Sequence, residues 1–321
     1  MKVWVFYPPL KVMSGGCMVL LQIARQLLSL ERLGGILYWD APPQGPDCAG
    51  LPWIKAAHAP VRSEDIVVVP EGWPNALAFG FRAKCRTVVY CQNWAYLFHG
   101  LEPALRWRDL PVEFWAVSDP VAWHMEQVLG RRPAIIRPAI DTGLFRPSES
   151  KPSGPPRIAF MPRKNKALAD QIRRIFEERN PKTALEWVPI HGLDRLGVAE
   201  VLRSCHVFLV TGFPEGFSLP SLEAMACGCL CVGFTGFGGW DYMRQIENDW
   251  FVPHGYALRD VPWSGNGWWS ADGDVLGAAL GLERAVARLS NGAAWKRIVE
   301  NALKTVGDYT LPRQMRELEL V

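Results

Sequence analysis

Short apolar runs alternate with longer segments of helical spacing from the first residues onward. Residues 2–7 and 36–39 are nearly continuous apolar runs, and residues 17–30 between them carry apolar side chains three and four positions apart. Such runs are typical of strands buried on both faces of a parallel sheet, and the intervening spacing is that of an amphipathic helix. The beginning of the chain therefore predicts a strand–helix–strand unit of a doubly wound sheet.

The same alternation continues through most of the remaining sequence. It predicts strands at residues 66–69, 87–91, 114–117, 134–137, 157–161, 185–190, 206–210, 229–234 and 250–252, and helices at residues 121–129, 167–178, 198–204, 275–289 and 293–306. Residues 261–272 show neither period and are predicted to be irregular, with Trp268 and Trp269 packing in that loop. Alternating strands and helices indicate an α/β protein.

A segment rich in proline, serine and charge divides this pattern into two halves. Residues 146–156 have the composition of an interdomain linker, and 321 residues exceed the usual size of a single core. We therefore expect a first domain at residues 1–147, a linker at 148–156 and a second domain at 157–306. Each domain should contain a Rossmann-like doubly wound sheet, and the two sheets should face each other across a cleft.

Composition and charge narrow the class of protein. Apolar residues make up 49% and charged residues 21% of the chain, as in ordinary globular proteins. A net charge of +3 is too small to indicate nucleic acid binding, and no apolar run reaches the about 20 residues that span a bilayer. The N-terminus is a short strand broken by Pro8 and Pro9 and not a signal peptide, so we expect a cytoplasmic protein.

A basic and aromatic patch in the first half bears on membrane contact. Residues 105–108 read Leu-Arg-Trp-Arg and residues 114–115 read Phe-Trp, a composition found in interfacial segments. Peripheral membrane contact is one interpretation of this patch. Ordinary packing beside a solvated turn is the alternative that the pattern favours.

The eight cysteines indicate buried thiols and not a metal site. Cys227, Cys229 and Cys231 are separated by single residues, the last two lie in a predicted strand, and no Cys-x-x-Cys pair or histidine cluster accompanies them. Zinc sites have other spacings, and cysteine is among the most frequently buried residue types. The sequence therefore predicts no metal ligands.

The stretch 214–228 has the strongest functional pattern. It lies between two predicted strands and contains a glycine loop followed by a short helix, with Ser218 as the expected N-cap and Gly228 as the stop. Phosphate binds well at such a helix N-terminus, because free N–H groups and the helix dipole converge there. Glu215 and Glu223 add carboxylates that accept hydrogen bonds from hydroxyl groups. The pattern indicates a ligand with both phosphate and sugar.

Cationic side chains follow the strand predicted at residues 157–161. Arg163, Lys164 and Lys166 stand at its carboxyl end, near the helix that follows Glu215. A diphosphate there would meet point charges and a bidentate guanidinium. A solvated basic loop is the alternative, since lysine and arginine are mostly exposed.

Further candidates follow predicted strands of the first half. Gly15 and Gly16 form either a tight turn or a ligand loop. Glu71 and the segment that begins at Gln92 each come directly after a strand. Ligand sites of open α/β sheets lie beyond the carboxyl ends of the strands, so these residues are candidates for a ligand site.

These residues together resemble a known family. Glu215-Gly216-Phe217-Ser218-Leu219-Pro220, with residues 222–226 and Gly228, looks like the E-x7-E motif of the retaining group 1 glycosyltransferases, glycosyltransferase family 4. Gly238-Gly239 with Asp241-Tyr242 resembles that family's Gly-Gly-x-x-Glu stretch. The resemblance covers residues 115–255 well and the first 110 residues in outline. It implies a GT-B fold, in which residues 307–321 pack back on the first domain.

The resemblance also implies a role for each matching residue. Glu215 would contact the donor sugar hydroxyls and Glu223 the ribose hydroxyls, while Arg163 and Lys166 would hold the diphosphate and stabilise it as a leaving group. The other implied donor-binding residues are Gly216, Phe217, Ser218, Leu219, Lys164, Gly15 and Gly16, and the acceptor-side candidates are Gln92, Asn93, Trp94 and His99, together with Glu71. The cation spacing is shorter than the family's, so Lys164 and Lys166 are alternatives for the working lysine.

The implied reaction is transfer of a sugar, with retention of anomeric configuration, from a nucleotide-diphosphate sugar. The acceptor would be a glycan, a lipid-linked glycan or a small molecule. The nucleotide sugar is a substrate, so no cofactor is implied, and the family needs no metal because cations and a helix N-terminus stabilise the leaving group. A sugar-nucleotide epimerase or phosphorylase of the same fold, and a non-catalytic sugar-nucleotide-binding partner, are the alternatives.

Overall fold

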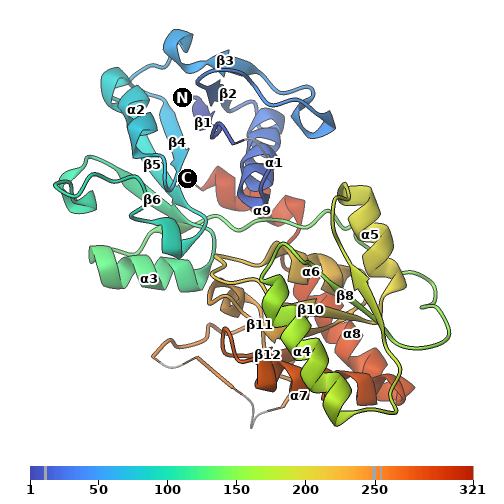
Figure 1. Ribbon diagram of the computed structural model, residues 1–321. Helices are drawn as coiled ribbons and strands as arrows, with labels where there is room; N and C mark the ends of the chain where they lie inside the picture. The colour runs from blue at the N-terminus through green and yellow to red at the C-terminus, as the bar shows by residue number, and fades with distance from the viewer. Residues whose placement is uncertain (11–12, 248–250, 254, 321) are drawn as a thin grey trace. The chain divides into compact units, whose positions relative to one another are not determined.

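The chain forms two compact α/β units. The structure, a computed structural model, describes residues 1–10, 13–247, 251–253 and 255–320. One unit consists of residues 1–138 together with the C-terminal segment from Leu311, and the other consists of residues 139–310 (Figure 1). Each unit has its own parallel sheet, so the predicted α/β architecture with two Rossmann-like sheets is confirmed.

The first unit is built on a seven-stranded sheet whose strands are all parallel to their neighbours. Its order is β3-β2-β1-β4-β5-β6-β7. The strands are β1 (Val3–Phe6), β2 (Leu33–Tyr38), β3 (Trp53–Lys55), β4 (Ile66–Pro70), β5 (Arg86–Cys91), β6 (Glu113–Ala116) and β7 (Ala134–Ile135). The central strands β1 and β4 are buried at every position, which explains their continuous apolar sequence. The strand order reverses between β1 and β4, and ligand sites of such sheets lie at this switch point.

Four α-helices and several short 3₁₀ turns complete the first unit. The helices are α1 (Gly15–Ser29), α2 (Leu77–Ala83), α3 (Asp119–Leu129) and α9 (Leu311–Glu319), and the turns are η1 (Pro46–Cys48), η2 (Ala56–His58), η3 (Pro74–Ala76), η4 (Trp94–Tyr96) and η5 (Trp107–Asp109). Ser14 is the N-cap of α1 and its hydroxyl accepts a hydrogen bond from the Cys17 N–H. Gly15 and Gly16 therefore form the first turn of α1, and the loop predicted there ends two residues earlier than expected.

The C-terminal helix α9 packs on α1 in the first unit (Figure 1). The Gln26 and Arg32 side chains donate to the backbone carbonyls of Leu311 and Leu318, at 3.0 and 2.9 Å. Glu317 accepts from the Arg137 N–H at 2.7 Å and pairs with the Arg137 guanidinium at 3.2 Å. These contacts join the last helix to residues almost 200 to 300 positions earlier in the sequence.

The second unit is built on a five-stranded parallel sheet in the order β12-β11-β10-β8-β9. Its strands are β8 (Arg157–Phe160), β9 (Glu186–Pro189), β10 (Val207–Val210), β11 (Leu230–Phe234) and β12 (Gly267–Ser270). Its helices are α4 (Lys166–Arg179), α5 (Arg195–Ser204), α6 (Leu219–Ala226), α7 (Val275–Leu289) and α8 (Gly292–Gly307), with the 3₁₀ turn η6 (Gly238–Asp241). The core is formed by residues of four strands and of α4, α7 and α8, among them Ile158, Phe176, Leu209, Val232, Trp268 and Leu282.

One strand of this sheet was not predicted. Residues 261–272 were expected to be irregular, but β12 lies within them and pairs with β11. Trp268 and Trp269 are fully buried in it, so their packing role is correct although the predicted loop is wrong. The strand predicted at 250–252 begins outside the described residues, and Phe251 and Val252 are not in a strand.

The segment predicted as a linker packs on the second unit. The Lys151 ammonium donates to the carbonyls of Leu202, Arg203 and Cys227, at 3.2, 3.1 and 2.8 Å. The division between the units lies at residues 138 and 139, nine residues before the boundary expected at 147. Prolines and serines in this stretch thus mark an irregular segment that is held in place by the second unit.

The burial of the cysteines and the length of the apolar helices can be compared with the sequence predictions. Cys227, Cys229 and Cys231 are buried free thiols, as predicted, and burial raises the pKa of Cys227 to about 12. Among the described residues no helix is both long and apolar enough to cross a membrane.

Candidate active site

Two glycine loops meet at the carboxyl end of β10. The Glu215 N–H donates to the Gly236 carbonyl at 3.0 Å, and the Gly238 N–H donates to the Glu215 carbonyl at 2.9 Å. A Cβ atom on Gly238 would lie 2.0 Å from the backbone of Gly216, so only glycine allows this approach. The two loops therefore fix the backbone of Glu215 from both sides.

The Glu215 carboxylate pairs with the ammonium of Lys164. Lys164 lies on the loop after β8, and this loop is tied to the end of β10 by two further contacts. Thr211 donates its hydroxyl proton to the Lys164 carbonyl, and the Asn165 amide donates to the Thr211 carbonyl at 2.8 Å. Asn165 has a left-handed backbone, with φ of 59°, which directs the chain from this loop into α4. The basic loop is therefore a fixed part of the site.

Lys166 has a different environment from Lys164. It is the first residue of α4, where it pairs with Asp170 one turn later at 2.5 Å, and 63% of its side chain is exposed. The Lys164 side chain is 31% exposed and faces Glu215. Of the two lysines between which the sequence could not decide, the structure brings Lys164 to Glu215.

Glu223 lies in α6 and is half-buried. Burial raises the pKa of Glu223 to about 7, against the opposing effect of Arg195 and Arg163. The charge of Arg163, a candidate from the basic loop, thus favours the ionised form of this carboxylate. Arg195 begins α5 and was missed, because a single arginine at a helix start has no pattern that relates it to Glu223.

The start of α6 is supported by aromatic residues. Ser218 occupies the N-cap position with a left-handed φ of 67°, but its hydroxyl bonds to the Ser221 hydroxyl at 2.9 Å and does not cap the helix. The predicted capping role is therefore wrong, because the left-handed backbone places the hydroxyl elsewhere. The Tyr242 hydroxyl donates to the Ser218 carbonyl at 2.7 Å, and the buried Phe217 ring packs on those of Tyr242 and Tyr309. The N-cap residue therefore makes no side-chain hydrogen bond to the first turn, which starts at Leu219.

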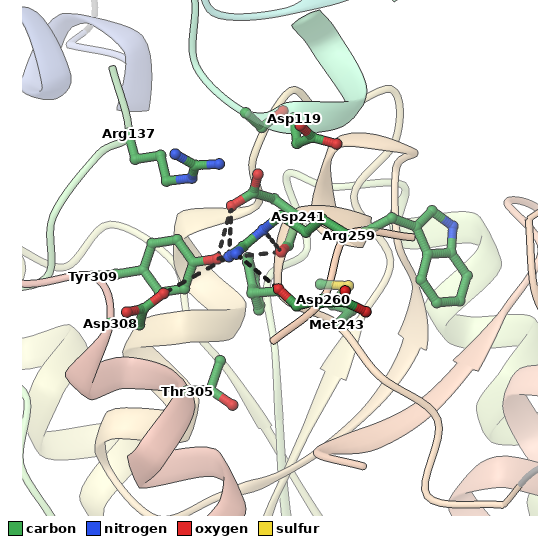
Figure 2. Close-up of polar contacts among 12 residues, drawn as sticks. Asp119, Arg137, Asp241, Met243, Arg259, Asp260, Thr305, Asp308 and Tyr309 are labelled. Atoms are coloured by element: carbon green, nitrogen blue, oxygen red, sulfur yellow. Dashed lines mark hydrogen bonds and ion pairs between the residues drawn. The ribbon is translucent and has the colours of Figure 1, made fainter. Parts of the chain in front are cut away.

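The Tyr309 hydroxyl belongs to a polar cluster with Asp241 and Arg259 (Figure 2). Asp241 is fully buried, and its carboxylate accepts from the Tyr309 hydroxyl at 2.7 Å. Arg259 donates to that hydroxyl at 2.6 Å and to the Asp241 carbonyl at 2.9 Å, and its guanidinium lies 3.8 Å from Asp308. Because a buried carboxylate is costly unless it is paired, this cluster depends on all of its members. It places Asp241, part of the predicted Gly-Gly-x-x-Glu stretch, in a supporting position.

Asp272 is a second carboxylate near Glu215. It follows β12 and accepts from the Gly236 N–H at 2.9 Å. Burial raises the pKa of Asp272, and the negative charge of Glu215 raises it further. The sequence did not indicate this residue, because the strand that positions it was not predicted.

The residues of this unit surround a small cavity at the end of β10. It is lined by polar and apolar side chains that include Met161, Lys164, Thr211, Glu215, Ser218 and Pro220. Within the part of the chain that the structure describes, no group of three or more histidine, cysteine, aspartate or glutamate side chains could hold a metal ion. Cation, carboxylates and an uncapped helix start are the chemical groups that this edge offers.

Most candidate residues of the first unit follow β5, and Gly15 and Gly16 begin α1. A Cβ atom on Gly16 would lie 3.3 Å from the Gln92 amide oxygen, so Gln92 lies against the first turn of α1. Asn93 caps η4 by accepting from the Ala95 N–H at 3.0 Å, and the Trp94 ring packs on His124 at 5.5 Å. His99 is exposed.

A family model identifies the site-bearing part of the chain. The model for the family described as "Glycosyl transferases group 1" matches residues 163–258, from the basic loop through Glu215 and Glu223 to the second glycine loop. This match supports the resemblance to group 1 glycosyltransferases that the sequence showed. The assignment of the individual roles is a separate question.

Known proteins with a similar sequence or fold include several glycosyltransferases. The alpha-1,6-glucosyltransferase of Actinobacillus pleuropneumoniae serotype 7 (strain AP76) is 32% identical over 204 residues, which cover 61% of this chain and 61% of that protein. The glycosyltransferase of Rickettsia africae has a TM-score of 0.68 at 13% identity, over 99% of this chain and 97% of that chain. The catalytic domain of starch synthase IV from Arabidopsis thaliana, bound to ADP and acarbose, has a TM-score of 0.64 at 13% identity, over 99% and 98%. The last two similarities show a shared GT-B fold.

Proposed function

We propose that this protein is a glycosyltransferase that moves a sugar, most simply glucose, from a nucleotide-diphosphate donor to a hydroxyl group of a glycan, lipid-linked or small-molecule acceptor. The observation that carries the proposal is the Lys164–Glu215 pair beside the uncapped start of α6. A cation for phosphate and a carboxylate for sugar hydroxyls are in contact there, within the segment that matches the family. The curated relative is a glucosyltransferase, which supports glucose as the sugar.

The proposed roles follow from the positions of the charges. Lys164 and Arg163 hold the diphosphate of the donor, and the N–H groups at the start of α6 complete its binding. Glu223 accepts hydrogen bonds from the ribose hydroxyls, and Glu215 accepts them from the sugar. The ADP in the starch synthase structure supports a nucleoside diphosphate as the leaving group.

The reaction breaks the bond between the anomeric carbon and the diphosphate oxygen. Lys164, Arg163 and the helix N-terminus stabilise the negative charge that develops on this oxygen, as in an oxyanion hole. The acceptor hydroxyl attacks from the face that the diphosphate leaves, passes its proton to the departing phosphate, and the product retains the anomeric configuration. These groups supply the charge stabilisation without a divalent ion, so activity should persist in EDTA.

The test is release of nucleoside diphosphate from UDP-, ADP-, GDP- and dTDP-glucose, with p-nitrophenyl β-D-glucopyranoside as acceptor. One donor should be turned over, and Glu215→Gln should reduce that rate by about 100-fold, the range for loss of a group that acts in the transition state. Glu178→Gln is the matched control, because Glu178 is an exposed glutamate of α4.

The outcome that would contradict the site assignment is an unchanged rate in Glu215→Gln. The anomeric coupling constant of the product, measured by NMR, tests retention. An altered nucleotide sugar formed without acceptor would instead support an epimerase, and binding of a nucleotide sugar without any turnover would support a non-catalytic partner.

A further inference from the structure

Glu71 makes a polar contact in the first unit that the proposed donor site does not use. Glu71 follows β4, and its two carboxylate oxygens accept from the N–H groups of Gln92 and Asn93, both at 2.8 Å. Its own N–H donates to the Tyr90 carbonyl at 3.2 Å. One carboxylate therefore fixes two consecutive peptide groups at the point where the chain leaves β5. We propose that Glu71 is a positioning residue for the acceptor of sugar transfer, a role that rests on the function proposed above.

The two loops that Glu71 joins are also packed on each other. Gly72 has a left-handed backbone with φ of 80°, and the His99 side chain lies 3.6 Å from where its Cβ would be. A Cβ on Gly100 would lie 3.0 Å from the Gly72 carbonyl oxygen. The Trp107 indole donates to the Leu97 carbonyl at 2.9 Å and closes the loop from its other end. Glu71 is thus at the base of a loop, residues 92–107, that is held at both ends.

This loop presents the groups that recognise a saccharide. The Gln92 amide, which both donates and accepts hydrogen bonds, lies against Gly16 in the first turn of α1. Tyr96 and Phe98 are 52% and 54% exposed, unusual for large aromatic side chains, and Trp94 is half-buried beside them. Sugar hydroxyls bond to amides, and the apolar C–H face of a sugar ring packs on aromatic rings. The combination suits a sugar acceptor better than a purely apolar ligand, which needs no amide.

Glu71 acts through Gln92 and Asn93 because both of its oxygens are occupied by their N–H groups. Burial raises the pKa of Glu71 to about 7, against the effect of these backbone hydrogen bonds. The titratable groups near it are Tyr90 and Cys91 of β5, both with pKa values raised by burial, and His99 beyond Gly72. Above pH 7 the ionised carboxylate accepts both hydrogen bonds, and below pH 7 a protonated oxygen opposes one N–H. Acceptor binding should therefore weaken as the pH falls through 7.

The experiment separates acceptor binding from donor chemistry. Glu71→Gln, Glu71→Asp and the exposed loop control Glu102→Gln are compared with the wild type at saturating donor, with p-nitrophenyl β-D-glucopyranoside as the acceptor probe. For Glu71→Gln we expect the KM for this probe to rise about tenfold, the effect of about one hydrogen bond, while kcat changes less than about threefold. The wild-type KM should rise below pH 7, and the KM of Glu71→Gln should be independent of pH between 6 and 8. Glu71→Asp should recover part of the affinity.

A second measurement does not depend on turnover. Hydrogen exchange of the Gln92 and Asn93 amides should be faster in Glu71→Gln than in the wild type, with no change in the second unit. Unchanged exchange would overturn the proposal, and so would faster exchange with an unchanged KM, which would leave Glu71 a purely structural role. The proposal would also be overturned if Glu71→Gln bound lipid vesicles more weakly and its KM were unchanged. That result would indicate that residues 92–107 bind a membrane. Failure of the proposed function is distinguished by absence of donor turnover in the wild type.

Discussion

Lys164 and Lys166 are two positions apart, and their side chains have different neighbours. Lys164 pairs with Glu215, whereas Lys166 pairs with Asp170 on the surface of α4. The sequence could not separate them, because both lie in one short basic loop and their order along the chain does not determine which way each side chain points. The left-handed backbone of Asn165 between them separates the two directions.

Substitution of the two lysines should have unequal effects. Lys164→Ala should reduce release of nucleoside diphosphate by about 100-fold or more, because a cation at the leaving group is lost. Lys166→Ala should change it less than about threefold, since an exposed pair one helical turn apart contributes little. Steady-state rates at saturating donor measure both, and a larger loss in Lys166→Ala would reverse the assignment.

Glu223 should make the protein less stable and its donor binding dependent on pH. Its pKa of about 7 lies above the usual value of 4.5, so the folded state favours the neutral carboxyl. The neutral Glu223 carboxyl therefore contributes fully to the free energy of unfolding below pH 4.5. This contribution is lost as the pH rises through 7. Under the proposed function, in contrast, donor binding uses the carboxylate and should strengthen over the same range.

Glu223→Gln tests both effects. The free energy of unfolding should increase by about 1–3 kcal/mol at pH 8 and by less at pH 5, because the substitution removes the cost of a buried charge. Denaturant titration at the two pH values measures this. Nucleotide affinity at pH 8, measured by calorimetry, should decrease in the same variant. An equal change in stability at both pH values would contradict the raised pKa.

At the scale of elements, most strands and helices could be predicted, and the errors have identifiable causes. The runs at β1, β4, β10 and β11 are continuously apolar because these strands are buried on both faces. β12 was missed because it has only four residues, Gly267–Ser270, follows a glycine-rich stretch, and is recognisable only through its pairing with β11. The N-cap expected at Ser218 failed for a similar reason, since propensity does not reveal a left-handed backbone.

Lys151 links two helices of the second unit. Its ammonium donates to carbonyls at the ends of α5 (Leu202 and Arg203) and α6 (Cys227), where helices leave backbone acceptors without intrahelical partners. Lys151→Met should lower the free energy of unfolding by about 1–3 kcal/mol, as expected for lost hydrogen bonds to a charged donor. Lys182→Met, at an exposed lysine, is the control. Chemical denaturation of both variants measures the difference, and equal stabilities would show that water replaces the ammonium.

At the scale of the whole molecule, two α/β units were predicted, but their boundary was not. Proline and serine content placed it at residues 148–156, whereas the compact units divide at residue 138. Proline and serine content indicates that a segment lacks regular secondary structure. It does not indicate which unit the segment packs on. Lys164 and Glu215, which the structure brings into contact, were both candidates from the sequence, while Arg195 and Asp272 required the folded structure.

The helix α9 should stabilise the first unit. Deletion of residues 311–321 removes its contacts with Gln26, Arg32 and Arg137 and exposes the buried face of α1. The first unit should therefore unfold at a temperature lower by about 2–8 °C, as expected for the loss of about one to two kcal/mol from a domain of this size. Calorimetry of the full and shortened chains measures the shift. A transition of unchanged midpoint would mean that α9 contributes no stability.

The residues at which the second unit begins and ends are neighbours. The Ile140 N–H donates to the Tyr309 carbonyl at 2.7 Å, and Ile140 forms a parallel bridge with Thr310. The flanking ends in the first unit also meet, since the Gln314 amide donates to the Arg137 carbonyl at 2.8 Å. The second unit is therefore an inserted domain within the sequence of the first unit. A second unit from another protein of this fold could be exchanged at these two junctions, and the ends of the first unit could be joined by a short peptide.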